Sequence, residues 1–375
     1  MFSRFSQHAQ KPACGPDYYI MACAGILTLF GIALLASASS DLGITQFSDS
    51  YYFLSRQLYQ GIGLGLVGFF ICSNIFYGFF SKKYVAILLL GITIVALLLV
   101  FTPLGISANG ATRWLSFGSF SFQPAELLKL TFFIYLASWL SFKDHRSRSW
   151  KEGLVPFVAI LGVISGILFL QHSTSPVVML TAVALIMYFM SGAKLRYISA
   201  VVFGGIAIIA MVIAVTPYRA TRVLTYLNPE ADAQGTGYHI LQAKMAIGAG
   251  GLTGVGYGQS TMKYRLPETV GDSIFAVAGE EFGFIGSALI LLIFLGLILR
   301  MLFISNRIHD PFGRLLLIGF ACVIGLQVFT NVGAMTGILP LTGTPLPFMS
   351  YGGTSLAVFL TMIGISVNIS KYARR

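Results

Sequence analysis

Charged residues are scarce in this sequence. Only 10% of its 375 residues are Asp, Glu, Lys or Arg, and 56% are hydrophobic, whereas a soluble protein carries about 25% charged residues. This composition excludes an ordinary soluble fold. Apolar runs of about 18 residues or more take the place of the missing charges, and runs of that length predict transmembrane helices. We therefore predict an all-α polytopic membrane protein of about ten transmembrane helices, over residues 18–38, 58–80, 84–102, 124–142, 154–170, 175–191, 197–216, 273–304, 313–334 and 351–370.

Cysteine and histidine are few and scattered. The four cysteines show no CxxC spacing and lie outside the expected external loops, which argues against zinc binding and a disulfide framework. The five histidines form no HExxH pair, and there is no GxxxxGK[ST] loop. We expect no protein-built metal site and no certain cofactor. Residues 1–375 are expected to form a single integral membrane domain.

Positive charge is distributed unevenly. The formal net charge is +11, and most of the 24 Lys and Arg residues fall in connections on one side of the predicted helices, such as Lys82, Lys83, Arg146, Arg148 and Arg307. This asymmetry follows the positive-inside rule and places both termini in the cytoplasm. Membrane orientation explains the basic excess, so no nucleic-acid partner is expected. The first apolar run is too long for a signal-peptide core and is interpreted as an anchor.

Three polar segments gather on the opposite, external side: residues 108–130, a large loop over about residues 217–271, and LPFMSYGGTS at 346–355. In the last of these, Pro347 and the pair Gly352 and Gly353 are incompatible with a regular helix. Its hydroxyl groups need partners that lipid does not offer. The stretch must therefore lie at the surface or fold against protein.

The first polar segment contains an ordered set of polar side chains. Pro124 suits the first turn of a helix, and Gln123, Glu126 and Lys129 recur on one face of that helix. Ionisable groups at this depth usually line a cavity, and Arg113 precedes them in the chain. The alternative is a local Glu126–Lys129 ion pair with the lysine extending outward.

The large loop is basic and rich in glycine. Cations that could clamp an anionic ligand are Arg219, Arg222, Lys244, Lys263 and Arg265, although an interfacial role is the alternative. GAGGLTGVGYG resembles a dinucleotide fingerprint, but no strand precedes it, so we interpret its glycines as turns or close packing. The stretch YHILQAKMAI could lie along the bilayer surface.

Three acids begin the eighth apolar segment. Asp272 stands where a helix N-cap is expected, and capping alone would explain it. Glu280 and Glu281 lie deeper and need partners. Pairing with Lys129 or another base is the simplest explanation for them.

The same segments resemble the SEDS family (shape, elongation, division and sporulation), which includes FtsW, RodA and SpoVE. GILPLTGTPLPFMSYGGTS is similar to the family signature, NGATRWLSFG…QPAELLKL resembles its G-x-x-R-W…Q-P-x-E-x-x-K block, and LPETVGD resembles its L-P-E-x-x-x-D block. These matches lie in the family's order and extend over nearly the whole chain.

The resemblance implies a ten-helix glycosyltransferase that polymerises lipid II. It implies a catalytic acid at Asp272 and substrate-binding residues at Arg113, Gln123, Glu126, Lys129, Ser350, Gly352 and Gly353, to which the basic loop adds Lys263. Arg113, Lys129 and Lys263 would then hold the diphosphate, and a divalent cation (Mg or Mn) could help to neutralise it. In place of the family's Q-P-D-x-G-T, residues 171–176 read QHSTSP, so the acid is missing.

GVGYGQSTMKYRLPE favours the FtsW branch, with elongation as the second assignment. An FtsW-like protein would act at the septum with a class B penicillin-binding protein and other divisome proteins. A lipid II flippase and a non-catalytic divisome scaffold are the alternatives, since intramembrane acids and lysines would also serve a transport path.

Overall fold

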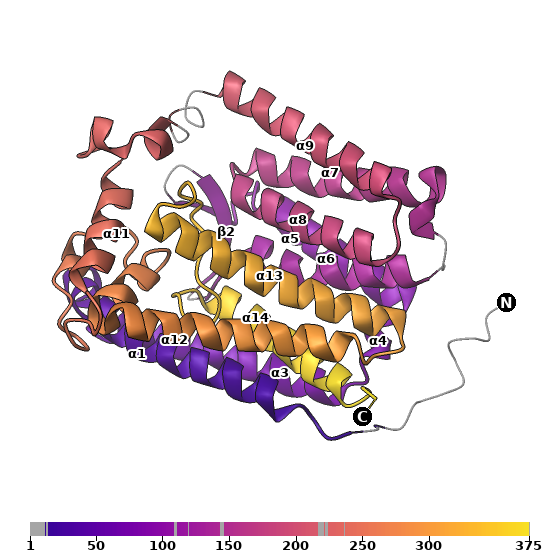
Figure 1. Ribbon diagram of the computed structural model, residues 1–375, viewed down its shortest axis with the longest axis horizontal. Helices are drawn as coiled ribbons and strands as arrows, with labels where there is room; N and C mark the ends of the chain where they lie inside the picture. Colours follow the sequence, from indigo (N-terminus) through magenta and orange to yellow (C-terminus); the bar gives the residue numbers. More distant parts are fainter. Residues whose placement is uncertain are drawn as a thin grey trace.

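The computed structural model describes residue 12 and residues 14–108, 111–118, 120–142, 146–216, 221, 224–235 and 237–374. Long helices run side by side through the molecule (Figure 1). In chain order the first half contains α1 (Tyr18–Phe47), α2 (Tyr52–Arg56), the π-helix η1 (Gln57–Gly63), α3 (Leu64–Asn74), α4 (Gly78–Ser81), α5 (Lys83–Leu99), α6 (Pro124–Ser141), η2 (Arg146–Arg148), η3 (Trp150–Leu154) and α7 (Val155–Leu170). The second half contains α8 (Thr174–Met190), α9 (Leu195–Val215), η4 (Pro229–Asp232), α11 (Tyr238–Ala249), η5 (Met262–Tyr264), α12 (Ile274–Ser305), α13 (Pro311–Thr336) and α14 (Gly353–Ser370).

Helices cover most of each of the ten predicted apolar segments, which confirms the all-α polytopic class, although residues 75–77 interrupt the predicted 58–80 segment. Five helical stretches within the described residues are long and apolar enough to cross a membrane: Tyr18–Phe47, Trp150–Leu170, Ile274–Ser305, Pro311–Thr336 and Gly353–Ser370. Shorter apolar helices include Lys83–Leu99 and Thr174–Met190. The predicted boundaries are least accurate for α1, which continues nine residues past the predicted end at residue 38.

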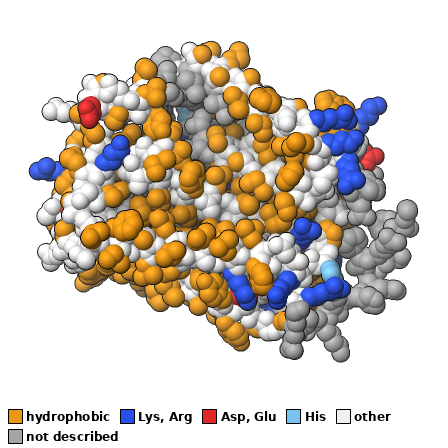
Figure 2. Space-filling model, viewed as in Figure 1, with side chains coloured by type: hydrophobic (Ala, Val, Ile, Leu, Met, Phe, Trp, Pro, Cys, Tyr) orange, Lys and Arg blue, Asp and Glu red, His pale blue; other side chains and the backbone are white. Residues whose placement is uncertain are grey.

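α13 and α14 form the centre of the bundle. α13 packs against α12, α6, α8 and α11, and α14 packs against α3, η1 and α6. Phe312, Phe320 and Phe359 of these two helices are fully buried. Figure 2 shows hydrophobic side chains across the middle of one face, with Lys and Arg mainly at the end where the C-terminus lies. That distribution agrees with the charge asymmetry in the sequence.

A small antiparallel sheet joins α5 to α6 and was not predicted. β1 (Gly105–Ala108) pairs with β2 (Ala111–Phe117), which pairs with β3 (Phe120–Phe122). Gly118 has a φ of +65° at the turn between β2 and β3, a backbone conformation that glycine adopts without strain. As predicted, Pro124 occupies the first turn of α6.

α12 is broken near its start. Gly283 has φ +63° and ψ −162°, which are not helical values. A loop from the glycine-rich stretch fills the break, because Val255 and Gly256 donate to the carbonyl oxygens of Glu280 and Glu281, and Phe284 donates to that of Gly251. A side chain at Gly254 would lie 2.1 Å from the Glu281 carbonyl oxygen. The interpretation of these glycines as turns and close packing is therefore confirmed.

Candidate active site

The LPFMSYGGTS stretch folds against protein. Leu346, Phe348 and Met349 are buried, and the ring of Phe348 packs between those of Phe294 and Phe359. Phe348 has a φ of +63°, an uncommon and strained conformation for a bulky residue. The surrounding helices hold this strained conformation in place.

The same stretch holds the chain that leads into α12. The Ser350 hydroxyl donates to the carbonyl oxygen of Gly271 at 2.8 Å and accepts from the Leu346 amide at 2.7 Å. The Tyr351 amide donates to the carbonyl oxygen of Val270 at 2.8 Å. Ser350 is buried, and the two hydrogen bonds of its hydroxyl group position the backbone next to Asp272.

Asp272 lies half-buried between this stretch and α13. The amide of Asn331 donates to the carbonyl oxygens of Asp272, at 2.9 Å, and Thr344, at 2.8 Å. A methyl group on Gly343 would lie 3.4 Å from Oδ2 of Asp272, so the carboxylate lies alongside the 341–345 backbone. Asp272 is not the N-cap as the capping interpretation expected, because α12 begins at Ile274 and its N-cap is Ser273.

A histidine of the large loop supports the same turn. His239 on α11 lies 2.7 Å from the Ser273 hydroxyl, which itself donates to the carbonyl oxygen of Pro267. Since the one hydroxyl hydrogen is used, Nε2 of His239 carries a proton and donates. Burial lowers the pKa of His239, which favours the neutral ring. His239 was not among the site residues predicted from the sequence.

Glu126 and Lys129 form a buried polar chain with α13. Lys129 Nζ lies 2.8 Å from Glu126 Oε2 and donates to Gln327 Oε1 at 2.9 Å. Gln327 in turn donates to the carbonyl oxygen of Pro345 at 2.8 Å. The predicted alternative of an ion pair is present, but its outward-extending lysine is wrong, because Lys129 is only 2% exposed and faces the bundle interior.

Arg113 of β2 binds the end of α7. Its Nε donates to the carbonyl oxygen of Gln171 at 3.4 Å, and its Nη2 donates to that of His172. The Ser175 hydroxyl donates to the carbonyl oxygen of Thr342, next to Gly343. Arg113 and Asp272 are therefore linked through the 171–175 and 342–343 loops.

Gln57 and the two glycines connect the stretch to η1. Gln57 donates to the Ser350 carbonyl oxygen at 3.2 Å and accepts from the Gly352 amide at 3.0 Å. A methyl group on Gly353 would lie 2.8 Å from Cβ of Gln60, so the close approach observed is to η1. The Gln123 amide donates to the Thr354 hydroxyl at 3.4 Å, which brings the start of α6 to the same place.

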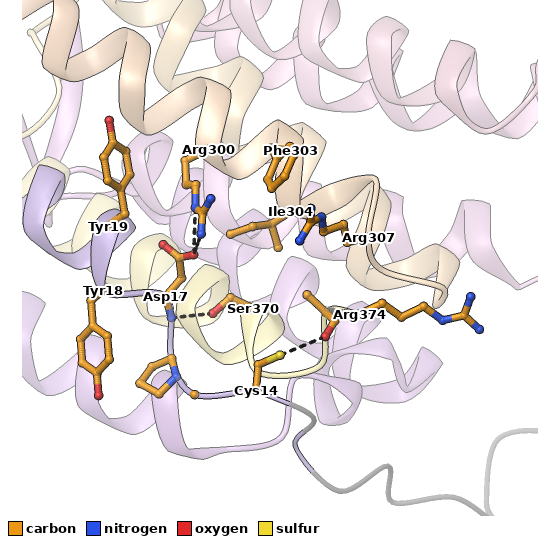
Figure 3. A pocket seen from close by; sticks show the side chains of 13 residues that line it. Cys14, Asp17, Tyr18, Tyr19, Arg300, Phe303, Ile304, Arg307, Ser370 and Arg374 are labelled. Carbon is orange, nitrogen blue, oxygen red and sulfur yellow. Dashed lines mark hydrogen bonds and ion pairs between the residues drawn. The ribbon is translucent and has the colours of Figure 1, made fainter.

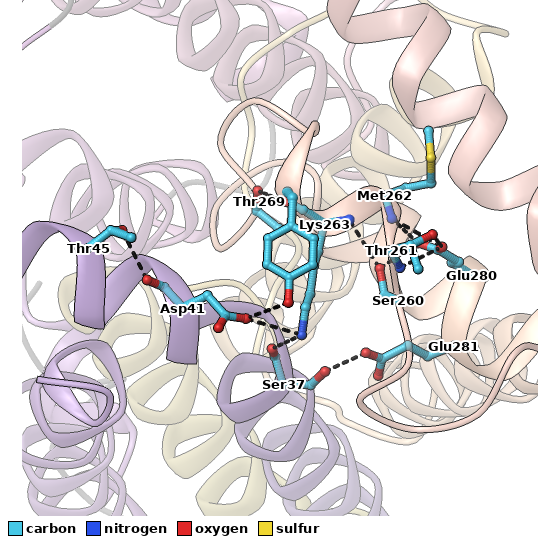
Figure 4. Close-up of polar contacts among 11 residues, drawn as sticks. Ser37, Asp41, Thr45, Ser260, Thr261, Met262, Lys263, Thr269, Glu280 and Glu281 are labelled. Atoms are coloured by element: carbon cyan, nitrogen blue, oxygen red, sulfur yellow. Dashed lines mark hydrogen bonds and ion pairs between the residues drawn. The ribbon is translucent and has the colours of Figure 1, made fainter.

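Lys263 belongs to a separate cluster against α1 (Figure 4). Its Nζ donates to the carbonyl oxygen of Ser37 at 3.2 Å and lies 3.5 Å from Oδ2 of Asp41. The Tyr264 hydroxyl donates to the same Asp41 oxygen at 3.0 Å. The ammonium group of Lys263 thus faces α1, whereas its main chain remains close to the turn before α12 through the Thr269 hydroxyl.

Glu280 and Glu281 have partners other than those predicted. Glu280 accepts hydrogen bonds from the Ser260 hydroxyl and from the amides of Thr261 and Met262, and Glu281 accepts one from the Ser37 hydroxyl. The expected pairing with Lys129 is wrong, because that lysine pairs with Glu126. Both acids fix the loop before η5 to α1 and α12.

The remaining basic loop residues that the structure describes are Lys244 and Arg265. Lys244 on α11 reaches Gly337, where a methyl group would lie 2.6 Å from its Nζ, and Arg265 is exposed. Arg219 and Arg222 lie outside the described residues. α11 buries Ile240, Ala243 and Ala246 against α12 and α13, so it packs on the bundle.

Three amide side chains were not anticipated: Gln57, Gln327 and Asn331. All are buried, and each donates to a backbone carbonyl of the 344–350 region. Gln327 and Asn331 are four residues apart in an otherwise apolar helix, which is a sequence signal for one polar face. Within the described ranges, no group of three or more His, Cys, Asp and Glu side chains lies close enough together to hold a metal ion.

Comparison with known proteins identifies the family of this chain. The Cell cycle protein family (FtsW/RodA/SpoVE) matches residues 17–375. The chain is 38% identical to "Probable peptidoglycan glycosyltransferase FtsW" of Geobacter metallireducens, covering 94% of each chain. It is 36% identical to "Stage V sporulation protein E" of Bacillus subtilis, covering 96% of this chain and 98% of that protein.

The fold also matches a solved structure. A chain from "Structural coordination of polymerization and crosslinking by a peptidoglycan synthase complex" superposes with a TM-score of 0.80 at 26% identity, covering 95% of this chain and 97% of that one. The chain therefore belongs to the FtsW/RodA/SpoVE family of SEDS proteins.

Proposed function

We propose that this protein is a peptidoglycan glycosyltransferase that polymerises lipid II at the outer face of the cytoplasmic membrane. The observation that carries the proposal is the half-buried carboxylate of Asp272, positioned between the 341–355 loop and α13 by Asn331 and Ser350. The names of its relatives support the activity.

In this mechanism Asp272 is the general base. Its carboxylate takes the proton of an acceptor sugar hydroxyl while that oxygen attacks the anomeric carbon of the donor. The bond from that carbon to the diphosphate breaks, and undecaprenyl diphosphate leaves with the electron pair. A positioned base contributes about 10²–10⁴-fold to such a step.

The cationic groups have different roles in this proposal. Arg113 lies at the loops that lead to Asp272, and its guanidinium fork suits a diphosphate. Lys129 is buried between Glu126 and Gln327, so we assign it to positioning the 345–355 loop. Lys263 contacts α1 and fixes the turn before α12.

The relatives support a role in division and a partner enzyme. Curated proteins named FtsW match at 38–39% identity over 94% of this chain, which favours septal synthesis over elongation. The solved neighbour comes from a peptidoglycan synthase complex. We infer that a class B penicillin-binding protein supplies cross-linking beside this chain, together with other divisome proteins.

The decisive experiment uses purified protein alone with lipid II. We expect long glycan strands on a gel, whereas movement of labelled lipid II across vesicles without polymer would support a flippase. The polar groups described above, from Arg113 to Asp272, lie at one end of the bundle. This arrangement favours an enzyme over a transport path through the membrane.

Orientation is tested by cysteine labelling. Ala231 and Lys151 are exposed in the loop before α11 and in η3. In a variant lacking the four native cysteines, we expect Ala231→Cys to react with an impermeant reagent on intact cells and Lys151→Cys to remain unlabelled. The opposite pattern would reverse the proposed orientation and place Asp272 at the inner face.

A further inference from the structure

A pocket of about 520 Å³ lies beside the C-terminal end of α12 (Figure 3), whereas Asp272 precedes the start of that helix. Its walls come from the start of α1, the end of α12 and the chain after α14. Asp272 precedes α12 and Arg300 lies in its last two turns, and the helix is broken at Gly283, so the pocket lies at most about 40 Å from the candidate active site at 1.5 Å per residue. The proposed glycosyltransferase reaction does not use it.

The pocket has an excess of positive charge. Arg300, Arg307 and Arg374 line it with a single acid, Asp17. Both carboxylate oxygens of Asp17 already have partners. Oδ2 accepts two hydrogen bonds from Arg300, at 2.9 and 2.7 Å, and Oδ1 caps α1 by accepting from the Ile20 amide. Arg307 and Arg374 are both exposed. The charge of Asp17 balances that of Arg300 and leaves the other two arginines in excess.

The chain ends hold this pocket in a fixed shape. The Cys14 amide donates to the Lys371 carbonyl oxygen, and the Asp17 amide donates to the Ser370 hydroxyl at 3.0 Å. The Arg374 amide donates to the carbonyl oxygen of Arg307 at 3.1 Å. The guanidinium of Arg307 stacks 4.2 Å from the ring centroid of Phe303, and this contact orders it.

Aromatic and apolar side chains surround these arginines. Tyr18, Tyr19 and Phe303 line the pocket and are 71%, 51% and 45% exposed. Exposed aromatic rings beside basic residues are typical of the membrane–water interface. Exposed leucines and an isoleucine continue from the pocket along α1 and α12: Ile26, Leu29, Leu292, Leu295 and Leu299.

We propose that this pocket binds the phosphate of an anionic phospholipid, with Arg307 and Arg374 contacting the head group. The acyl chains would lie on the apolar stripe of α1 and α12. Arginine suits phosphate because its planar fork makes paired hydrogen bonds, and basic pockets between helices on the cytoplasmic side bind such head groups. A soluble phosphate would make the same hydrogen bonds to the arginines, but it has no acyl chains to contact the apolar stripe.

Native mass spectrometry and thermal unfolding of the purified full chain test the proposal. Phosphatidylglycerol is the probe, and phosphatidylethanolamine and inorganic phosphate are the comparisons. We expect phosphatidylglycerol alone to remain bound and to raise the unfolding temperature. In Arg307→Gln/Arg374→Gln its affinity should fall about 30-fold, at roughly 1 kcal/mol for each arginine.

Lys83→Gln/Arg314→Gln is the matched control, because it removes the same charge from exposed positions outside the pocket. It should keep the parent's affinity. Equal stabilisation by both lipids, or equal loss of affinity in both double variants, would overturn the proposal. Stabilisation by inorganic phosphate alone would assign the pocket to a soluble anion and would also overturn it. Since binding is the readout, none of these outcomes depends on glycan synthesis.

Discussion

Arg113 reaches across from the small sheet to Gln171, donating through Nε to its carbonyl oxygen at 3.4 Å at the C-terminal end of α7. Residues 171–176 read QHSTSP and lack the acid of the motif Q-P-D-x-G-T. The helix carbonyls offer partial negative charge at this point. In this chain, therefore, backbone carbonyl oxygens at the end of α7 are acceptors for Arg113.

Replacing Arg113 should impair catalysis more than folding. Arg113→Ala removes a cation beside the site and should reduce lipid II polymerisation at least tenfold, roughly the effect of one charged hydrogen bond. Arg113→Lys keeps the charge without the fork and should be intermediate. Membrane insertion, measured by detergent extraction and size-exclusion chromatography, should be normal for both. Full polymerisation by the alanine variant would exclude Arg113 from diphosphate binding.

Asp272→Asn separates the catalytic role from a structural one. Asn is nearly isosteric but does not accept a proton as a carboxylate does, so glycan synthesis should fall by about 10²-fold or more at unchanged thermal stability. Asp272→Glu should be partly active at best, because the longer side chain displaces the carboxylate.

Asp310→Asn is the matched control for this substitution. Asp310 caps α13 through the Gly313 amide at 3.0 Å, at the other end of the bundle, and asparagine caps a helix nearly as well. Its polymerisation rate should equal the parent's. Robust synthesis by Asp272→Asn would move the search for a base to another residue.

The buried Glu126–Lys129 pair should respond very differently to single and double replacement. Lys129→Met leaves Glu126 charged and without its cation in a site 9% exposed or less, which should cost about 3–5 kcal/mol of stability. Glu126→Gln/Lys129→Met removes both charges and should recover most of that loss. Thermal unfolding measures both, with the exposed Lys151→Met as the control. A double variant no more stable than the single one would contradict the coupling.

Gly353 allows α14 to approach η1, so a methyl group there should be costly. Gly353→Ala places a carbon 2.8 Å from Cβ of Gln60 and should lower stability by about 1–3 kcal/mol. Gly91→Ala on α5 is the control, because a methyl group there meets nothing within 4 Å. Unfolding temperatures of the two variants should differ clearly. Equal unfolding temperatures would show that η1 moves to accommodate the methyl group without a loss of stability.

His239 should make stability depend on pH. Burial lowers its pKa in the folded protein, so the unfolded chain binds the proton more readily. Its contribution is present above the unfolded pKa of about 6.5 and is lost as the pH falls below that value. His239→Gln keeps a donor for Ser273 and should flatten the pH profile of unfolding between about pH 5 and 7. The exposed His309→Gln should leave the profile unchanged, and an unchanged profile in His239→Gln would rule out this source.

The helices were predictable because lipid requires long apolar runs, and α5, α8 and α13 begin within two residues of their predicted positions. The partners of the polar groups were not. Gln327 accepts a hydrogen bond from Lys129, which lies 198 residues earlier in the chain. The local spacing of residues does not predict such a contact. The sheet of β1 to β3 was missed because its short strands interrupt an otherwise helical chain.

The site was predictable only in part for the same reason. The proximity of Asp272 to the LPFMSYGGTS stretch depends on Ser350 and Asn331 reaching backbone carbonyls. Backbone acceptors are present at every residue and therefore leave no pattern in the sequence. Lys263 illustrates the same limit, because its partners on α1 precede it by more than 200 residues.

Gly283 determines the order in which this part of the chain can assemble. The carbonyl oxygens of Glu280 and Glu281 bind amides of the 255–256 loop, and in lipid they would otherwise need partners within a continuous helix. We expect α12 to enter the membrane unbroken and to open at Gly283 only when the preceding loop docks. The loop and the first turns of α12 then form one late-assembling unit, and Asp272 acquires its final position when that unit closes.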